Sequence, residues 1–111
     1  MKKYTLLLVL GILGACNKNS ENNKNLVTKT IWVRGNCEMC QERIETKLKN
    51  LKHISQAHWD VNTSMLKVTF DSTQTSILFI ENSVAETGHG TKNVASEPSV
   101  IAELPDCCKP Q

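Results

Sequence analysis

The spacing of apolar residues between positions 26 and 96 changes several times, and this order constrains the fold more than any other feature. Apolar residues at every second position predict strands, whereas apolar residues three and four positions apart predict amphipathic helices. The two patterns follow one another in the order β-α-β-β-α-β. Strands are expected at residues 27–33, 54–61, 66–70 and 91–95, and helices at residues 38–51 and 77–84.

This order predicts an α+β fold of the ferredoxin-like kind, in which two helices cover one face of a four-stranded antiparallel sheet. A chain of 111 residues allows one small domain with a modest core. We place that domain at residues 26–96 and a cysteine-containing tail at residues 97–111. The sequence has no Ser-His-Asp arrangement, phosphate-binding glycine loop or recognisable pair of carboxylates, so we do not expect an enzyme.

The first fifteen residues have the pattern of a secretory signal peptide. Lys2 and Lys3 precede an apolar run at residues 6–15, which is too short to span a bilayer. Small residues directly before Cys16 resemble the lipobox of bacterial lipoprotein precursors. That resemblance implies cleavage before Cys16 and its lipidation, and two or three acyl chains give stable anchoring. The alternative is a plain signal peptide followed by an accidental cysteine.

Residues 16–25 contain a polar tract that cannot bury apolar surface, so we interpret them as a lipidated, flexible tether. The expected location is the bacterial cell envelope, lipid-anchored and extracytoplasmic, facing the periplasm or the cell surface. Removal of residues 1–15 leaves 11 basic and 11 acidic side chains. A net charge near zero provides no field for binding nucleic acid, so we expect no nucleic-acid partner.

The most informative motif is the C-x-x-C of Cys37 and Cys40, which falls between an expected strand and the first turn of an expected helix. Free N–H groups and the positive end of the helix dipole stabilise thiolates at this position. Two thiolates in an exposed loop suit Cu(I) or another thiophilic ion, such as mercury, zinc or cadmium. Only two protein sulfurs are needed for low-coordinate Cu(I), and such a site stays open to an incoming ligand.

At this motif the chain resembles the heavy-metal-associated (HMA) domain family, which includes copper chaperones, domains of copper-transporting ATPases and the mercury-binding protein. The resemblance covers residues 27–94. It implies a ferredoxin-like fold, Cys37 and Cys40 as metal ligands, and transfer of the ion by thiolate exchange with a donor or acceptor protein such as a copper transporter. The family's usual Gly-Met-x before the first cysteine is replaced here by Gly35-Asn36, and Met39 lies inside the pair.

Other interpretations of the same cysteines remain. Cys37 and Cys40 are also compatible with a structural disulfide or, together with Cys107 and Cys108, with a thiol-disulfide redox protein. A third possibility is an interaction module that keeps the HMA shape without a metal.

The loop after the second expected helix lies at the same end of the fold as the C-x-x-C motif. Glycines flank His89 in this loop and are expected to leave it exposed. A neutral imidazole there offers a third ligand or a pH-sensitive gate, whereas the plain alternative is a solvent-exposed loop histidine.

The tail carries adjacent cysteines, Cys107 and Cys108, which rarely bond to each other because the ring is strained. We expect the fourth strand to end at the far pole, from which the tail is long enough to fold back to Cys37 and Cys40. It would then add one or two thiolates or form a disulfide with that pair. The remaining alternatives are an independent, weak metal site and a tail without function.

Overall fold

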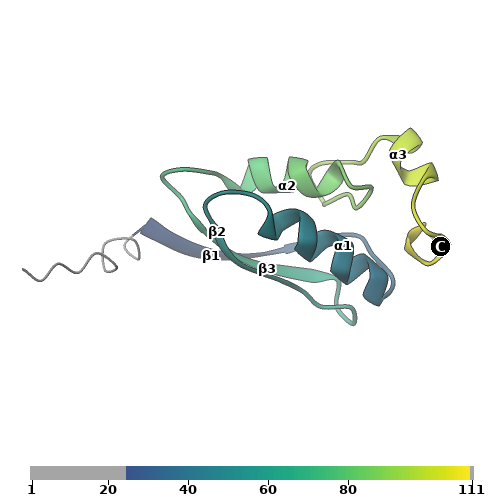
Figure 1. Cartoon of the computed structure of the whole chain (residues 1–111), viewed down its shortest axis with the longest axis horizontal. Coiled ribbons are helices and arrows are strands. Elements are labelled where there is room, and N and C mark those ends of the chain that lie inside the picture. The colour runs from purple at the N-terminus through teal and green to yellow at the C-terminus, as the bar shows by residue number, and fades with distance from the viewer. Residues whose placement is uncertain (1–24, 111) are drawn as a thin grey trace, which may run out of the picture.

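A computed structural model describes residues 25–110, which form two layers (Figure 1). Strands β1 (Leu26–Trp32), β2 (Ile54–Trp59) and β3 (Met65–Asp71) form one antiparallel sheet in the order β1-β3-β2. Helices α1 (Glu38–Lys49) and α2 (Ile77–Ala85) pack together over it. The predicted leader 1–15 and Cys16 lie outside the described residues. None of the helices in residues 25–110 is long and apolar enough to cross a membrane.

The core lies between the sheet and the two helices, as the apolar spacing predicts. Every second residue of β3 is buried, and each of these side chains faces the helices because successive strand residues point to opposite faces. In α2, Ser76 caps the helix by accepting a hydrogen bond from the Phe79 backbone N–H at 3.1 Å. The fully buried aliphatic and aromatic residues of this core are Val33, Ile44, Leu48, Trp59, Leu66, Val68, Ile80 and Val84.

The predicted fourth strand at residues 91–95 is wrong. This part of the chain makes only one isolated bridge to the end of the β1 segment, between Val33 and Thr91. The Thr91 hydroxyl accepts hydrogen bonds from the backbone N–H groups of Asn93 (3.3 Å) and Val94 (3.0 Å). Because these bonds and the Thr91 N–H···O=C Val94 bond of 2.8 Å close a tight turn, the chain cannot extend along β1.

The turn reverses the path that we expected for the tail. Instead of running to the far pole, the chain forms helix α3 (Pro98–Ala102) and the short 3-10 helix η2 (Asp106–Cys108). Both lie at the end of the domain where β1 leads into α1 (Figure 1). Leu104 is buried and joins the main core, so the tail is packed against the domain.

Candidate metal centre

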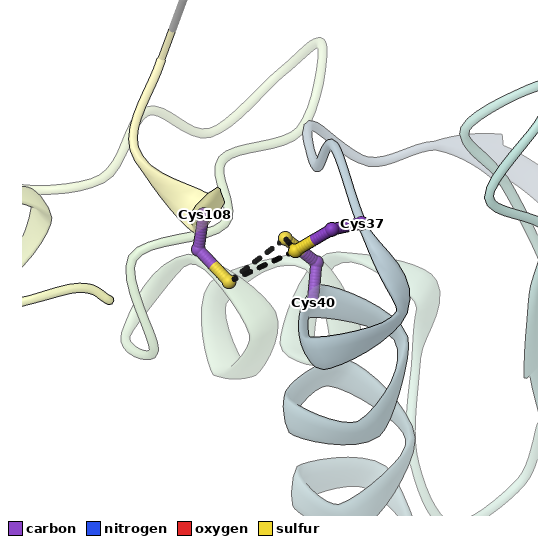
Figure 2. A group of neighbouring side chains, drawn as sticks. All are labelled: Cys37, Cys40 and Cys108. Atoms are coloured by element: carbon purple, nitrogen blue, oxygen red, sulfur yellow. Dashed lines mark hydrogen bonds between the residues drawn. The ribbon is translucent and has the colours of Figure 1, made fainter. Parts of the chain in front are cut away.

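The C-x-x-C segment forms the start of α1, as predicted. Cys37 is the extended residue before the helix, and its carbonyl accepts hydrogen bonds from the backbone N–H groups of Cys40 (3.0 Å) and Gln41 (3.2 Å). This first turn brings the Cys37 and Cys40 sulfurs to 3.4 Å from each other (Figure 2). The two sulfur atoms therefore lie side by side at the N-terminus of α1.

The pair is less exposed than the sequence led us to expect. Cys40 has no exposed surface, and Cys37 is half-buried. Gly35 lies so close to the Trp59 ring that a Cβ on Gly35 would be 2.7 Å from a ring carbon. The Trp59 indole N–H in turn donates to the Val33 carbonyl at 3.0 Å, which fixes the ring beneath the loop. The core therefore covers Cys40 from below.

The C-terminal tail adds a third sulfur. Cys108 is fully buried, and its Sγ lies 2.9 Å from the Cys40 Sγ and 3.8 Å from the Cys37 Sγ (Figure 2). Among residues 25–110, these three side chains form a group in which all ligand atoms lie within 4.8 Å of one another. The tail thus does fold back to the motif, which was one of the alternatives left open by the sequence.

The neighbouring cysteine plays a different part. Cys107 forms a disulfide with Cys37, and the Cα atoms of the two residues are 6.3 Å apart. Cys40 and Cys108 are the free thiols within the described part of the chain. The Cys107 and Cys108 sulfurs are 4.0 Å apart and are not bonded to each other. One structure therefore contains both a disulfide and a sulfur cluster at the same motif.

Two side chains in the segment that leads into Cys37 bind the tail by hydrogen bonds, and we did not identify either of them from the sequence. The Arg34 guanidinium donates to the carbonyl of Cys108 at 3.3 Å and to that of Gly88 at 2.7 Å. The Asn36 amide donates to the carbonyls of Cys107 (3.1 Å) and Lys109 (2.7 Å). The available signal was the departure from the family's Gly-Met-x pattern, which falls on this segment.

Burial determines the acid–base behaviour of Cys108. Loss of solvent around the thiol, followed by its hydrogen bond to Cys40 and the proximity of the Cys40 charge, raises the pKa of Cys108 to about 12. The positive charges of Arg43 and Arg34 act in the opposite direction but are smaller effects. The thiol is thus protonated at neutral pH without a metal, and an incoming soft ion must displace its proton.

His89 does not occupy the exposed position that we expected. Its side chain is fully buried, Nδ1–H donates to the Arg34 carbonyl at 3.0 Å, and Nε2 has no hydrogen-bond partner among the described residues. Burial, with smaller contributions from Arg34 and Arg43, lowers the pKa of His89 to about 4. It is not a member of the three-sulfur group.

A small two-layer α+β domain that gathers cysteine sulfurs at the start of its first helix has the architecture typical of thiolate metal-binding domains. Residues 23–90 match the model of the heavy-metal-associated domain, which is more than half of the chain. The chain therefore belongs to the heavy-metal-associated domain family. Cys37 and Cys40 lie inside the matched range, whereas the tail cysteines lie beyond it.

Solved structures agree with this assignment. The apo N-terminal domain of the zinc(II) ATPase ZiaA is 34% identical, with 60% of this chain and 94% of that chain covered and a TM-score of 0.53. The CopZ metallochaperone (17% identity, 59% and 98% covered, TM-score 0.56) and oxidized MerP from Ralstonia metallidurans CH34 (20%, 60% and 96%, 0.52) share the fold. The search of curated protein sequences gave no match.

Proposed function

We propose that this chain is a membrane-tethered, extracytoplasmic protein that binds Cu(I) through Cys37 and Cys40 and transfers or sequesters it. The observation that carries the proposal is the 3.4 Å separation of the two sulfurs at the N-terminus of α1. Helix N–H groups and the helix dipole stabilise thiolates at this position. The protein acts as a binding protein and not as an enzyme.

The donor atoms favour a soft ion. The ligand group found within residues 25–110 contains only sulfur, with no carboxylate or imidazole in it. Thiolates select Cu(I) over hard ions, which prefer oxygen ligands. Mercury, zinc and cadmium are also thiophilic, and the names of the similar structures include both copper and zinc proteins. Cu(I) is our choice because two thiolates satisfy it without a further protein ligand.

Transfer proceeds by exchange of thiolates. The half-buried Cys37 is the sulfur that an incoming partner can reach, whereas Cys40 is enclosed by the core. A thiolate of the partner would add to the ion, and the Cys37 bond to the ion would break while Cys40 still holds it. A second thiolate of the partner would then replace Cys40, which completes the transfer. The partner is a metal-donor or metal-acceptor protein, such as a copper transporter or a related domain. The Cys37–Cys107 disulfide must be reduced before this sequence begins.

An anaerobic competition tests the proposal. The full chain is reduced and titrated against a chromophoric Cu(I) chelator, and we expect retention of one Cu(I) per chain. The double variant Cys37→Ser/Cys40→Ser should lose this copper, whereas the matched control Cys107→Ser should keep it because Cys107 lies outside the sulfur group. If the reduced wild-type protein gives up its copper to a weak chelator, the proposal is wrong.

The disulfide supports a second candidate, a thiol-disulfide redox protein that uses Cys37, Cys40, Cys107 and Cys108. The Cys37–Cys107 bond lies beside the free Cys40 thiol, which is 3.4 Å from the Cys37 sulfur. Attack by a Cys40 thiolate on that sulfur would form a Cys37–Cys40 bond and release the Cys107 thiolate. A reversible two-electron couple in a protein that takes up no metal would favour this candidate over copper binding.

A further inference from the structure

The last residues of the tail complete a triangle of sulfur atoms over the start of α1. Cys37 and Cys40 provide two corners that are 3.4 Å apart, and Cys108 provides the third, 3.8 Å and 2.9 Å from them. Figure 2 shows the three side chains pointing toward one another from two segments of the chain. The family match ends at residue 90, so Cys108 lies outside the part of the chain that matches the family.

Cys108 is held in this position from both sides. Arg34 binds the carbonyl of Cys108 itself, and Asn36 binds the carbonyls of the residues before and after it, Cys107 and Lys109. Both anchoring side chains come from the segment that leads into Cys37. The tail and the C-x-x-C segment are therefore tied together directly, and the Cys108 side chain has no exposed surface.

A second attachment lies one turn earlier in the tail. Leu104 is buried in the core, and it packs so tightly on Gly88 that a Cβ on Gly88 would be 2.8 Å from it. Gly88 also has a φ of +101°, a conformation that side chains rarely adopt. The close approach of the two residues brings the tail down onto the domain just before η2.

The sulfur triangle fits a soft ion after a small expansion. A metal–sulfur bond of about 2.3 Å places the sulfurs of a planar three-coordinate site about 4.0 Å apart. The observed distances are shorter than this by between a few tenths of an ångström and about one ångström. Rotation of the Cys108 side chain would lengthen its distances to the other two sulfurs, and rotation of the half-buried Cys37 side chain would lengthen the 3.4 Å distance to Cys40.

We propose that Cys108 is a third sulfur ligand of the ion bound by Cys37 and Cys40, so that the tail closes a three-sulfur site. This inference rests on the proposed function, because it extends the same site. The third bond makes dissociation of the ion slower, since one more bond must break before a partner can remove it. A tail-closed site therefore suits sequestration better than rapid delivery.

Formation of the site requires a reductant. A dithiol gives two electrons and two protons to the Cys37–Cys107 bond, which breaks to two thiols while the dithiol becomes a cyclic disulfide. Cu(I) then replaces the three thiol protons of Cys37, Cys40 and Cys108, which pass to the buffer. Cys107 is left as a thiol outside the triangle. In the oxidised chain Cys37 is blocked and the three-sulfur site does not form.

The adjacent cysteines provide a matched pair of variants. The full chain, purified in detergent and reduced anaerobically with a dithiol, is loaded with one equivalent of Cu(I). Copper X-ray absorption should count three sulfurs in the wild type and in Cys107→Ser, and two in Cys108→Ser. In chelator competition, Cys108→Ser should bind Cu(I) more weakly than the wild type. Loss of a residue that only supports a metal ligand weakens binding about 10–100-fold, so loss of the ligand itself should weaken it by at least that much.

The outcomes separate this inference from the proposed function. If the wild type holds Cu(I) with two sulfurs, or if Cys107→Ser weakens binding as much as Cys108→Ser, the third-ligand inference is overturned while copper binding stands. If neither the wild type nor any variant retains Cu(I), the proposed function fails as well. Because burial of a serine at position 108 risks unfolding, Cys108→Ala and its circular dichroism spectrum serve as a second test. A wild-type count of two sulfurs overturns the inference without any variant.

Discussion

Acidification should destabilise this domain through His89. The imidazole is fully buried, its Nδ1–H donates to the Arg34 carbonyl, and Nε2 faces no hydrogen-bond partner among residues 25–110. A proton on Nε2 would place a buried charge close to the guanidinium groups of Arg34 and Arg43. Burial first, and these arginines second, lower the pKa of His89 from 6.5 to about 4, although its hydrogen bond to Arg34 opposes the shift.

The sign and size of the effect follow from this shift. Between pH 6.5 and about 4 the unfolded chain binds a proton on His89 that the folded chain does not bind. The contribution to stability is therefore complete above pH 6.5 and is lost as the pH falls toward 4. With about 1.36 kcal/mol per pKa unit, the free energy of unfolding should drop by roughly 2–3 kcal/mol between pH 7.5 and 4.5.

Urea unfolding of the metal-free chain at a series of pH values measures this drop, with tryptophan fluorescence as the signal, since the buried Trp59 becomes exposed on unfolding. If the urea dependence is about 1 kcal/mol per molar, the midpoint falls by about 2–3 M across the series. The window stops at pH 4.5 to exclude Asp71. A hydrogen bond from the Thr73 side chain holds the pKa of Asp71 below 3.8, so its effect begins at lower pH.

His89→Asn is the control, because the Asn amide N–H replaces the Nδ1–H donor to Arg34 but does not titrate. This variant should be less stable at pH 7.5, owing to its smaller volume, and nearly insensitive to pH down to 4.5. The explanation is refuted if the wild type shows no drop over the window. It is also refuted if His89→Asn shows the same drop as the wild type.

Two further predictions concern the tail and the N-terminus. Leu104→Ala should lower the free energy of unfolding, measured in urea, by about 2–5 kcal/mol because it leaves a cavity at a buried position. Ser99→Ala, at an exposed position of α3, should change this free energy little. Equal effects of the two variants would contradict the packing of the tail on the core. In bacteria, the wild-type chain should partition with membranes and carry acyl chains detectable by mass spectrometry, and Cys16→Ser should lose both; an unmodified Cys16 in the mature wild-type chain would refute the lipid anchor.

The features that depend on local sequence were predictable. The positions of α1 and α2 follow from apolar residues three and four apart, and the site of Cys37 and Cys40 follows from the strand–helix junction. A helix turn brings residues three apart onto one side, so the proximity of these two sulfurs needed no tertiary information. The same argument extends to the antiparallel pairing of β2 and β3, which a short turn connects.

The prediction of a fourth strand was wrong for a reason that was partly visible in the sequence. Residues 91–95 contain β-branched residues, which favoured a strand. They also contain Thr91 two and three positions before Asn93 and Val94, a spacing at which a threonine hydroxyl can accept both backbone N–H groups. The turn formed in this way competes with strand pairing, and periodicity alone does not reveal which of them prevails.

The burial of His89 shows why flanking glycines misled the prediction. We took them as a sign of exposure, but a glycine also allows close packing because it has no side chain. Leu104 packs on Gly88, and a Cβ on Gly90 would be 3.2 Å from the Val94 carbonyl oxygen. The tail therefore packs on the residue before His89, and the turn at residues 91–94 packs on the residue after it. Contacts between residues so far apart in sequence cannot be derived from the loop itself.

Arg34 contacts both the loop after α2 and the C-terminal tail, and these contacts could not be predicted from the sequence. Its backbone N–H binds the Gly90 carbonyl at 2.8 Å and its carbonyl accepts from His89, so the loop after α2 is fixed on both sides of the imidazole. Its guanidinium binds the carbonyls of Gly88 and Cys108. One residue thus couples the buried histidine loop to the tail that carries the third sulfur. A protonated His89 would therefore lie against the residue that holds Cys108 in place.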